Sequence, residues 1–337
     1  MGRKAIVISN NFSGPDVENS GRLLFYSNVM DLLISNDFTY NGVNYLNPLL
    51  EMPIGSKRAD FAIVDSHFNL RLLLEFKELE HEVEIDRALK QVINYSRIAN
   101  PMFYGVIGII DLGVYKHIFQ DPSLYANMLI RIFDSDCLQT ECKPVYAENK
   151  RVYEEFPHML EDVIKVIFNI ISGKVRGKVR SYVRNEAFYQ YELARILTQY
   201  GIKVYPEYMV RLMDKRNNIT IPARIDLVLK IEDNLIPVEV KSYEVVSQEQ
   251  LEQLMKYMKL LELPLGYTGR GEIVWQFKSP LGVAANPEDG SIRLTVIDEL
   301  GNKIGEFSVS FVKKGENIYL PKNEEIEKFI EFIRSRA

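Results

Sequence analysis

Apolar residues along the chain follow helical and strand spacings in an order that occurs twice. In the first half, apolar positions three and four apart predict helices over 21–36 and 84–99. Short runs rich in branched and aromatic residues predict strands at 61–64, 70–74 and 104–110. The two earlier strands are separated by the five residues 65–69, four of them polar, which indicates a hairpin.

The second half repeats this order of helix, hairpin, helix and strand. Its predicted elements are a helix at 188–200, strands at 202–205, 209–212, 224–231 and 235–240, a helix at 247–261 that opens with a capping box at Ser247, and a strand at 273–277. A helix at 161–171 lies between the halves, and a hairpin at 292–311 and a helix at 324–333 follow. A repeat of about half the chain indicates domain duplication rather than a solenoid.

We therefore divide the 337 residues into two modules. The first covers 1–172, a basic linker covers 173–184, and the second module covers 185–337 with its C-terminal hairpin and helix. Each module is long enough to bury a core of its own. The linker contains several Lys and Arg residues that can contact phosphates, although a solvated linker has the same composition.

Composition describes a soluble globular protein, with 47% hydrophobic and 26% charged residues. No apolar run is long enough to cross a bilayer, so we expect no membrane association. The only cysteines, Cys137 and Cys142, are too few for a disulfide scaffold or a four-thiolate metal site. A cytoplasmic location is the default expectation. The net charge of −5 argues against a uniformly basic DNA binder but leaves a local basic face open.

Polar residues occupy matching places in the two halves. The first set is Asp60 on one hairpin strand, Glu75 and Lys77 at the end of the next, and Gln91 and Tyr95 on the following helix. The second set, in the same order, is Asp226, Glu239, Lys241, Gln253 and Tyr257. Each Asp belongs to an Arg-x-Asp sequence that starts at Arg58 or Arg224.

This pattern suits metal-dependent cleavage of phosphodiesters. Adjacent strands lie about 5 Å apart, so the Asp and Glu of one hairpin can share a hard cation such as Mg²⁺. Residues two apart on a strand share a face, which places Lys77 beside Glu75 and Lys241 beside Glu239. An ammonium there can orient water and offset charge on the phosphate. Gln and Tyr four apart share one helix face that can reach the same point.

Glu-x-Lys alone is a weak signal. It also occurs at 141–143 and 148–150, where no upstream Arg-x-Asp and no downstream Gln-x-x-x-Tyr helix accompany it. Charged strand ends and surface Gln and Tyr explain a single copy about as well as a site does. Two complete copies favour the site.

The combined pattern resembles the PD-(D/E)xK, or restriction-endonuclease-like, nuclease superfamily. Its Gln-x-x-x-Tyr element is similar to that of the nuclease domains of type I restriction subunits and RecB-type nucleases. The resemblance covers about residues 18–110 and 184–277. It implies an α/β fold with a mixed sheet flanked by helices in each module, Mg²⁺ as cofactor with Mn²⁺ able to substitute, and DNA as substrate. By position, Asp60, Glu75, Asp226 and Glu239 would be metal ligands, with Glu18 and Glu186, just before or at the start of the first helix of each module, as further acidic ligands.

Some family features are missing. Ala59 and Ile225 replace the proline of the family name. No phosphate-binding loop of a motor, no upstream His of the RecB type and no four-cysteine set is present.

Three hypotheses remain from the sequence. In the leading one, both modules are active, and the chain is an internal pseudo-dimer, or self-associates, so that each site cuts one strand. In the second, one module cuts and the other binds DNA or packs. In the third, the protein keeps the nuclease fold but only binds DNA or assembles.

Overall fold

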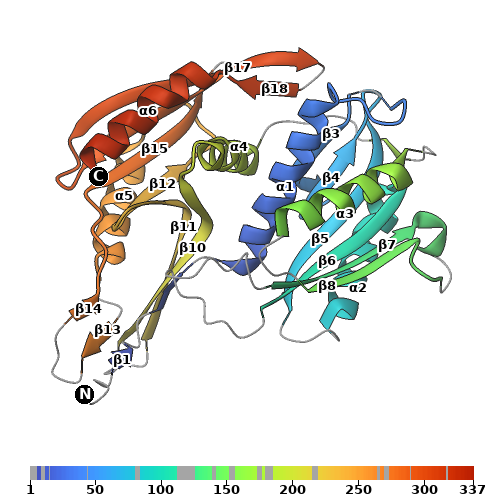
Figure 1. The fold of residues 1–337 in the computed structure, drawn as a ribbon, viewed down its shortest axis with the longest axis horizontal. Coiled ribbons are helices and arrows are strands. Elements are labelled where there is room, and N and C mark those ends of the chain that lie inside the picture. The colour runs from blue at the N-terminus through green and yellow to red at the C-terminus, as the bar shows by residue number, and fades with distance from the viewer. Residues whose placement is uncertain are drawn as a thin grey trace. The chain divides into compact units, whose positions relative to one another are not determined.

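The computed structural model describes residues 6–8, 12–14, 16–43, 45–79, 84–111, 126–138, 142–151, 156–172, 177–178, 185–214, 219–263, 266–268, 273–288, 290–315 and 318–337. The chain forms two compact units. The N-terminal unit contains Val17–Phe188 and Lys313–Ile318, and the C-terminal unit contains Met1–Asp16, Tyr189–Val312 and Tyr319–Ala337. Figure 1 shows the helices and strands of both units.

The N-terminal unit is built on one mixed sheet. Its strand order is β3-β4-β5-β6-β7-β8, with a short strand β9 paired to β5. Strands β5 and β6 are parallel, and the other pairs are antiparallel. The strands are β3 (Asn47–Ile54), β4 (Lys57–Val64), β5 (Asn69–Leu79), β6 (Phe103–Asp111), β7 (Ala126–Asp134), β8 (Tyr146–Arg151) and β9 (Gly177–Lys178).

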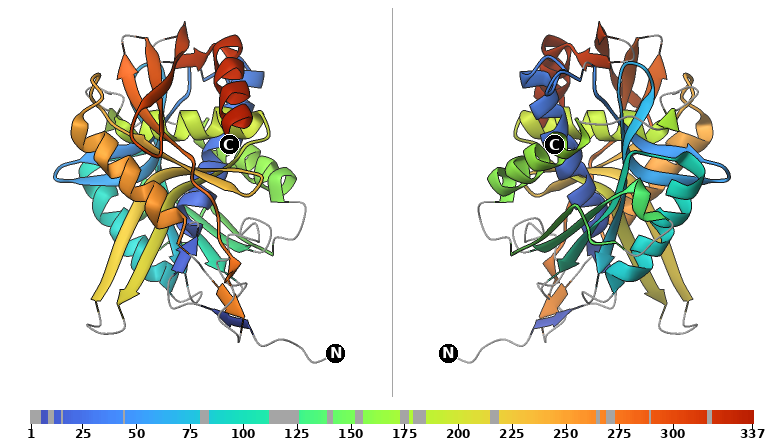
Figure 2. Two further views of the ribbon diagram at one scale, coloured as in Figure 1. Left: turned by 90° about the vertical axis from the view of Figure 1, so that its left-hand side faces the viewer. Right: turned by 90° about the vertical axis from the view of Figure 1, so that its right-hand side faces the viewer.

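Helices cover both faces of this sheet. Helices α1 (Val17–Ser35) and α3 (Phe156–Ile171) contact each other on one face, and α2 (Ile85–Ala99) packs on the opposite face against β5 and β6 (Figure 2). A parallel strand pair needs such a crossover, and α2 supplies it. Buried apolar residues of α2, such as Ala88 and Val92, complete the core on that face.

The C-terminal unit repeats this arrangement in a second mixed sheet of order β18-β17-β16-β15-β12-β11-β10-β2. Here β12 and β15 are the parallel pair, and helix α5 (Gln248–Leu261) connects them. The strands are β2 (Phe12–Gly14), β10 (Lys203–Asp214), β11 (Ile219–Ile231), β12 (Asn234–Val240), β15 (Leu281–Glu288), β16 (Ser291–Asp298), β17 (Lys303–Gly315) and β18 (Ile318–Pro321).

In the C-terminal unit helices pack on both faces of the sheet, because successive side chains of a strand point to opposite faces. Leu254 and Met258 of α5 pack with Ala284 and Ile297 on one face of the sheet. Phe329 of helix α6 (Asn323–Arg336) packs against a β17 ring on the other face (Figure 2). Helix α4 (Glu186–Gln199) precedes β10. The sheet is therefore covered on both sides, as its apolar strands require.

Several sequence predictions are confirmed. The helix predicted at 84–99 is α2, and the one predicted at 247–261 is α5, whose start Ser247 caps by accepting the amide of Gln250 at 3.1 Å. The expected α/β class, with mixed sheets flanked by helices, is also confirmed. Helix α1 begins at Val17, four residues before its predicted start, which brings Glu18 into its first turn.

The strand predicted to follow α5 was assigned to the wrong segment. The segment predicted at 273–277 forms only β14 (Ile273–Trp275), which pairs with β13 (Gly266–Thr268) in a small sheet that also includes β1 (Ile6–Ile8). The strand that follows α5 in the main sheet is β15. Its run Leu-Gly-Val-Ala-Ala-Asn-Pro contains small residues and a proline. Because such residues have a low strand propensity, the sequence did not predict this buried strand. Strands β3, β7 and β8 were not predicted, and 202–212 is one strand rather than two.

Further observations concern the linker and the cysteines. Within the predicted basic linker, Gly177–Lys178 forms β9, and Lys174, Arg180 and Tyr182 lie outside the described residues, so the domain boundaries stay a prediction.

Cys137, at the short helix Ser135–Leu138, forms a local disulfide with Cys142. Among the helices described, none is long and apolar enough to cross a membrane.

A cluster of three aromatic rings joins α1 to the sheet of the N-terminal unit. The Phe25 ring lies 5.2 Å from that of Phe61 and 5.4 Å from that of Phe76, both edge-on, and all three are fully buried. We expect Phe25→Ala to lower the free energy of unfolding by about 3–5 kcal/mol, because it removes a large buried side chain. Urea unfolding measures this. Ile98→Ala, at a residue 68% exposed on α2, should change stability by less than about 1 kcal/mol. An equal effect of the two variants would contradict this packing.

Candidate active site

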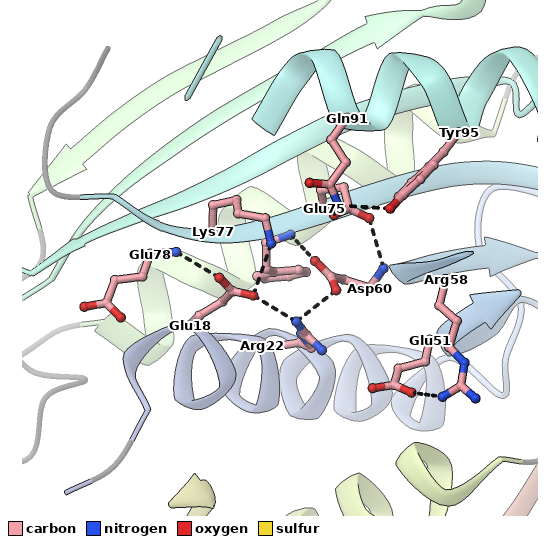
Figure 3. Close-up of polar contacts among 11 residues, drawn as sticks. Glu18, Arg22, Glu51, Arg58, Asp60, Glu75, Lys77, Glu78, Gln91 and Tyr95 are labelled. Atoms are coloured by element: carbon pink, nitrogen blue, oxygen red, sulfur yellow. Dashed lines mark hydrogen bonds and ion pairs between the residues drawn. The ribbon is translucent and has the colours of Figure 1, made fainter. Parts of the chain in front are cut away.

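The N-terminal unit brings Asp60 and Glu75 together where two strands stop pairing. The ladder between β4 and β5 has Phe61 opposite Leu74, and one step further Asp60 lies opposite Glu75. Here the Asp60 side chain accepts the backbone amide of Phe76 through Oδ2 at 2.8 Å. The Asp60 amide in turn donates to Glu75 Oε1 at 3.3 Å. Two side chains thus replace backbone partners and hold the carboxylates side by side (Figure 3).

The C-terminal unit has the same arrangement. The ladder between β11 and β12 has Leu227 opposite Val238, and the next step brings Asp226 opposite Glu239. Asp226 Oδ2 accepts the amide of Val240 at 2.7 Å, as Asp60 does from Phe76. The predicted pairing of an Asp and a Glu on adjacent strands is therefore present in both units.

A third carboxylate flanks each pair on the neighbouring strand, and the sequence did not reveal it. Glu51 of β3 and Glu207 of β10 fall at the one step missing from their ladders, opposite Asp60 and Asp226. Both have a positive φ, 48° and 51°, which is rare for glutamate and costs conformational energy. Backbone strain of this kind clusters at functional sites. Here it occurs at equivalent positions of the two units.

The arginine of each Arg-x-Asp sequence binds this flanking glutamate. Arg58 contacts Glu51 at 2.7 Å, and Arg224 contacts Glu207 at 2.5 Å. A positive φ at a glutamate in the preceding strand leaves no clear sequence signal. The recurring arginine two residues before the Asp was the available clue.

Gln91 and Tyr95 of α2 lie at the N-terminal pair. Gln91 Nε2 donates to Glu75 Oε2 at 2.7 Å and to the Tyr95 hydroxyl at 3.0 Å. Their (i, i+4) spacing puts both on the helix face that covers the sheet.

In the C-terminal unit, Gln253 and Tyr257 of α5 also contact each other, and the Tyr257 hydroxyl donates to the carbonyl of Arg224 at 3.0 Å. Gln250, another residue missed by sequence, donates to the Glu239 carbonyl at 3.0 Å. These contacts tie α5 to both strands of the site.

The two lysines contact different acids. Lys77 Nζ lies 3.4 Å from Glu18 Oε1, whereas Lys241 Nζ forms an ion pair with Glu239 on its own strand. Glu18 also accepts the amide of Glu78 at 3.2 Å (Figure 3). Glu18 therefore reaches the N-terminal site, and its role as a metal ligand stays a prediction. For the C-terminal site, the described contacts do not include Glu186, the first residue of α4.

The residue four positions after each of these glutamates enters its site, and neither was predicted. Arg22 Nη2 contacts Asp60 Oδ1 at 2.9 Å and Glu18 Oε1 at 3.2 Å. Gln190 Nε2 donates to Glu207 Oε1 at 2.9 Å and to the Asp226 carbonyl at 2.7 Å. A polar residue one turn after a candidate acid is the signal that could have found them.

The paired carboxylates are electrostatically strained. Burial raises the pKa of Glu75 to about 8, and the negative charge of Asp60 adds to the effect. Burial also raises the pKa of Asp226 to about 8, with a further contribution from Glu239. The pKa of Glu18 is raised by burial as well. Two acids held together in low-dielectric surroundings favour a proton or a cation between them.

The donor set fits a hard divalent cation, with two carboxylates in each pair. Within the described residues no cluster of three or more His, Cys, Asp and Glu is arranged to hold a metal. Mg²⁺ keeps several waters and binds through one or two carboxylates, so a pair satisfies its chemistry. Asp226 and Glu239 would hold it in the C-terminal unit.

Comparison with known proteins supports this interpretation of the sequence. Residues 160–268 match the family model of the PD-(D/E)XK nuclease superfamily, which confirms the predicted resemblance over the segment that contains the C-terminal Asp, Glu and Lys. Among solved structures, the type IIG restriction endonuclease BpuSI aligns with 50% of this chain and 19% of its own, at 15% identity and a TM-score of 0.32. At that score the likeness does not establish a shared fold. No curated protein sequence matches significantly.

The raised pKa of Asp226 predicts a pH-dependent stability of the metal-free protein. The folded chain keeps a proton on Asp226 that the unfolded chain, with a pKa of 3.8, has released. Stability should therefore fall as pH rises from about 4 to about 8. Asp226→Asn should make this dependence shallower but not remove it, because Glu75, whose pKa is also raised to about 8, still contributes. The variant should be more stable than wild type at pH 9 by about 1 kcal/mol or more.

Urea unfolding at several pH values in EDTA measures the effect. Asp233→Asn, at an exposed residue of the β11–β12 turn, is the matched control and should follow the wild-type profile. Parallel profiles for wild type and Asp226→Asn would contradict the prediction.

Proposed function

We propose that this protein is a divalent-cation-dependent nuclease that hydrolyses phosphodiester bonds of DNA. The observation that carries the proposal is the C-terminal site, where Asp226 and Glu239 face each other on adjacent strands with Lys241 at Glu239. This segment lies within the match to the PD-(D/E)XK nuclease superfamily. Mg²⁺ is the proposed cofactor, and Mn²⁺ should substitute for it.

The chain's own residues divide the work as follows. Asp226 and Glu239 bind the cation, which supplies Lewis-acid polarisation of the phosphoryl group and acidifies water. Lys241, 22% exposed, places an ammonium at the edge of the carboxylate pair. From there it can orient the attacking water and offset charge on the phosphate. The polar face of Gln253 and Tyr257 keeps α5 in place beside the strands.

We also propose that the two units arose by duplication. The same strand order, the same Asp-to-amide bond and the same strained glutamate support this. The N-terminal site carries the residues predicted for a second active site, including Lys77 and Glu75. The geometry favours the C-terminal site for cleavage because Asp226 Oδ1, unlike Asp60 Oδ1, has no hydrogen bond among the described residues.

Removal of the lysine ammonium tests the proposal. Lys241→Ala should slow Mg²⁺-dependent cleavage of supercoiled, linear or branched DNA by about a hundredfold or more, since it removes a group that acts on water and phosphate. EDTA should abolish cleavage by the wild type. Gel electrophoresis of the products measures both effects.

Lys143→Ala is the matched control, because Lys143 ends a Glu-x-Lys sequence outside the site and is exposed. It should cleave like wild type. Wild type and a Lys77→Ala, Lys241→Ala double variant that leave all substrates equally intact would contradict nuclease activity. Retained DNA binding in that case would favour the binding role over the enzyme.

A further inference from the structure

Arg22 is held inside the N-terminal site. One terminal nitrogen of its guanidinium bridges Asp60 on the sheet and Glu18 on α1, and its side chain is only 8% exposed (Figure 3). An arginine does not lose its proton in proteins, so this positive charge is permanent. The guanidinium thus bridges acids from two elements, as a bound cation would.

The carboxylate oxygens of the N-terminal pair all have protein donors. Asp60 Oδ1 accepts from Arg22, and Oδ2 accepts from the Phe76 amide. Glu75 Oε1 accepts from the Asp60 amide, and Oε2 accepts from Gln91. A metal ion entering here would have to displace a buried ion pair.

At the helix position of Arg22 the C-terminal unit has a glutamine. Gln190 stands four residues after Glu186, as Arg22 stands four after Glu18. Its neutral amide binds the Asp226 carbonyl and Glu207, and leaves the Asp226 carboxylate to the Val240 amide. Both sites otherwise keep the Asp, Glu, Lys, Gln and Tyr of the repeated pattern.

We propose that the Arg22 guanidinium takes the place of the metal ion in the N-terminal site, so that the chain binds one divalent cation, at Asp226 and Glu239. This rests on the function proposed for the C-terminal site. In the N-terminal site, the Arg22 guanidinium then neutralises the Asp60 and Glu75 pair without a metal ion. The identity of one residue on the first helix of each unit decides which site is open to a cation.

Titration with Mn²⁺, with free ion followed by electron paramagnetic resonance, counts the sites without any measurement of cleavage. Wild type should bind one Mn²⁺ per chain. Arg22→Gln should bind two, because it installs the neutral residue found at Gln190. Arg22→Lys keeps the positive charge and should still bind one.

The reciprocal variant and the acid variants locate each ion. Gln190→Arg should weaken binding at the C-terminal site by about a hundredfold or more, as expected when a buried pair must be broken. Asp226→Asn with Glu239→Gln should abolish binding. Asp60→Asn with Glu75→Gln should leave the single wild-type ion in place, and this holds even if Arg22→Gln does not fold.

Different outcomes separate this proposal from the proposed function. A wild type that binds two ions, one of which is lost in the Asp60→Asn, Glu75→Gln variant, would overturn the role of Arg22 and leave the nuclease proposal intact. A folded Arg22→Gln variant that still binds a single ion would also overturn it. If wild type binds none and Arg22→Gln binds one, the role of Arg22 stands and the function assigned to the C-terminal site falls.

Discussion

The site in each unit depends on one hydrogen bond, from a backbone amide to the carboxylate of an aspartate. In a regular sheet the amide of Phe76 or Val240 would donate to a carbonyl of the next strand. Here Asp60 and Asp226 accept these amides with their side chains. The carboxylate is thereby fixed at the point where the ladder stops, directly opposite the glutamate of the partner strand. Sheet geometry, rather than a flexible loop, sets the separation of the two acids, which is the precision that a catalytic constellation needs.

Such a fixed pair of buried acids creates a demand for positive charge, and the two units meet it differently. Raised pKa values of Glu75 and Asp226 show that each pair is unfavourable when fully ionised. The N-terminal unit supplies a guanidinium from its own α1. The C-terminal unit supplies an ammonium from Lys241 and an amide from Gln190, which leaves a carboxylate oxygen of Asp226 without a described partner. Similar folds thus give electrostatically different sites, as expected when function depends on particular side chains.

Much of this architecture could be predicted from sequence because it is local. The helical spacing of α2 and α5 and the alternation around Glu75 and Glu239 predicted elements and site residues together. What was missed depends on contacts between distant segments. The positive φ of Glu51 and Glu207 exists only because two neighbouring strands impose it. Strand β15 is rich in small residues that suit a close approach of α5, so its composition resembles a loop. Arg22 resembles an exposed polar residue of α1 until the fold brings it to Asp60.

The start of the chain belongs to the sheets of the C-terminal unit, and this affects the order in which the protein can fold during synthesis. Strand β2 pairs with Met209–Arg211 of β10, and β1 pairs with β13 at Gly266–Thr268. The intervening Val17–Phe188 belongs, with Lys313–Ile318, to the other unit, which does not include these strands. At a typical elongation rate of about 5–20 residues per second, the first residues wait tens of seconds on the ribosome for their partners. During that time Val17–Phe188, which make up most of the unit containing Arg22, are synthesised, and with them the arginine that bridges Asp60 and Glu18. The C-terminal site is completed only afterwards.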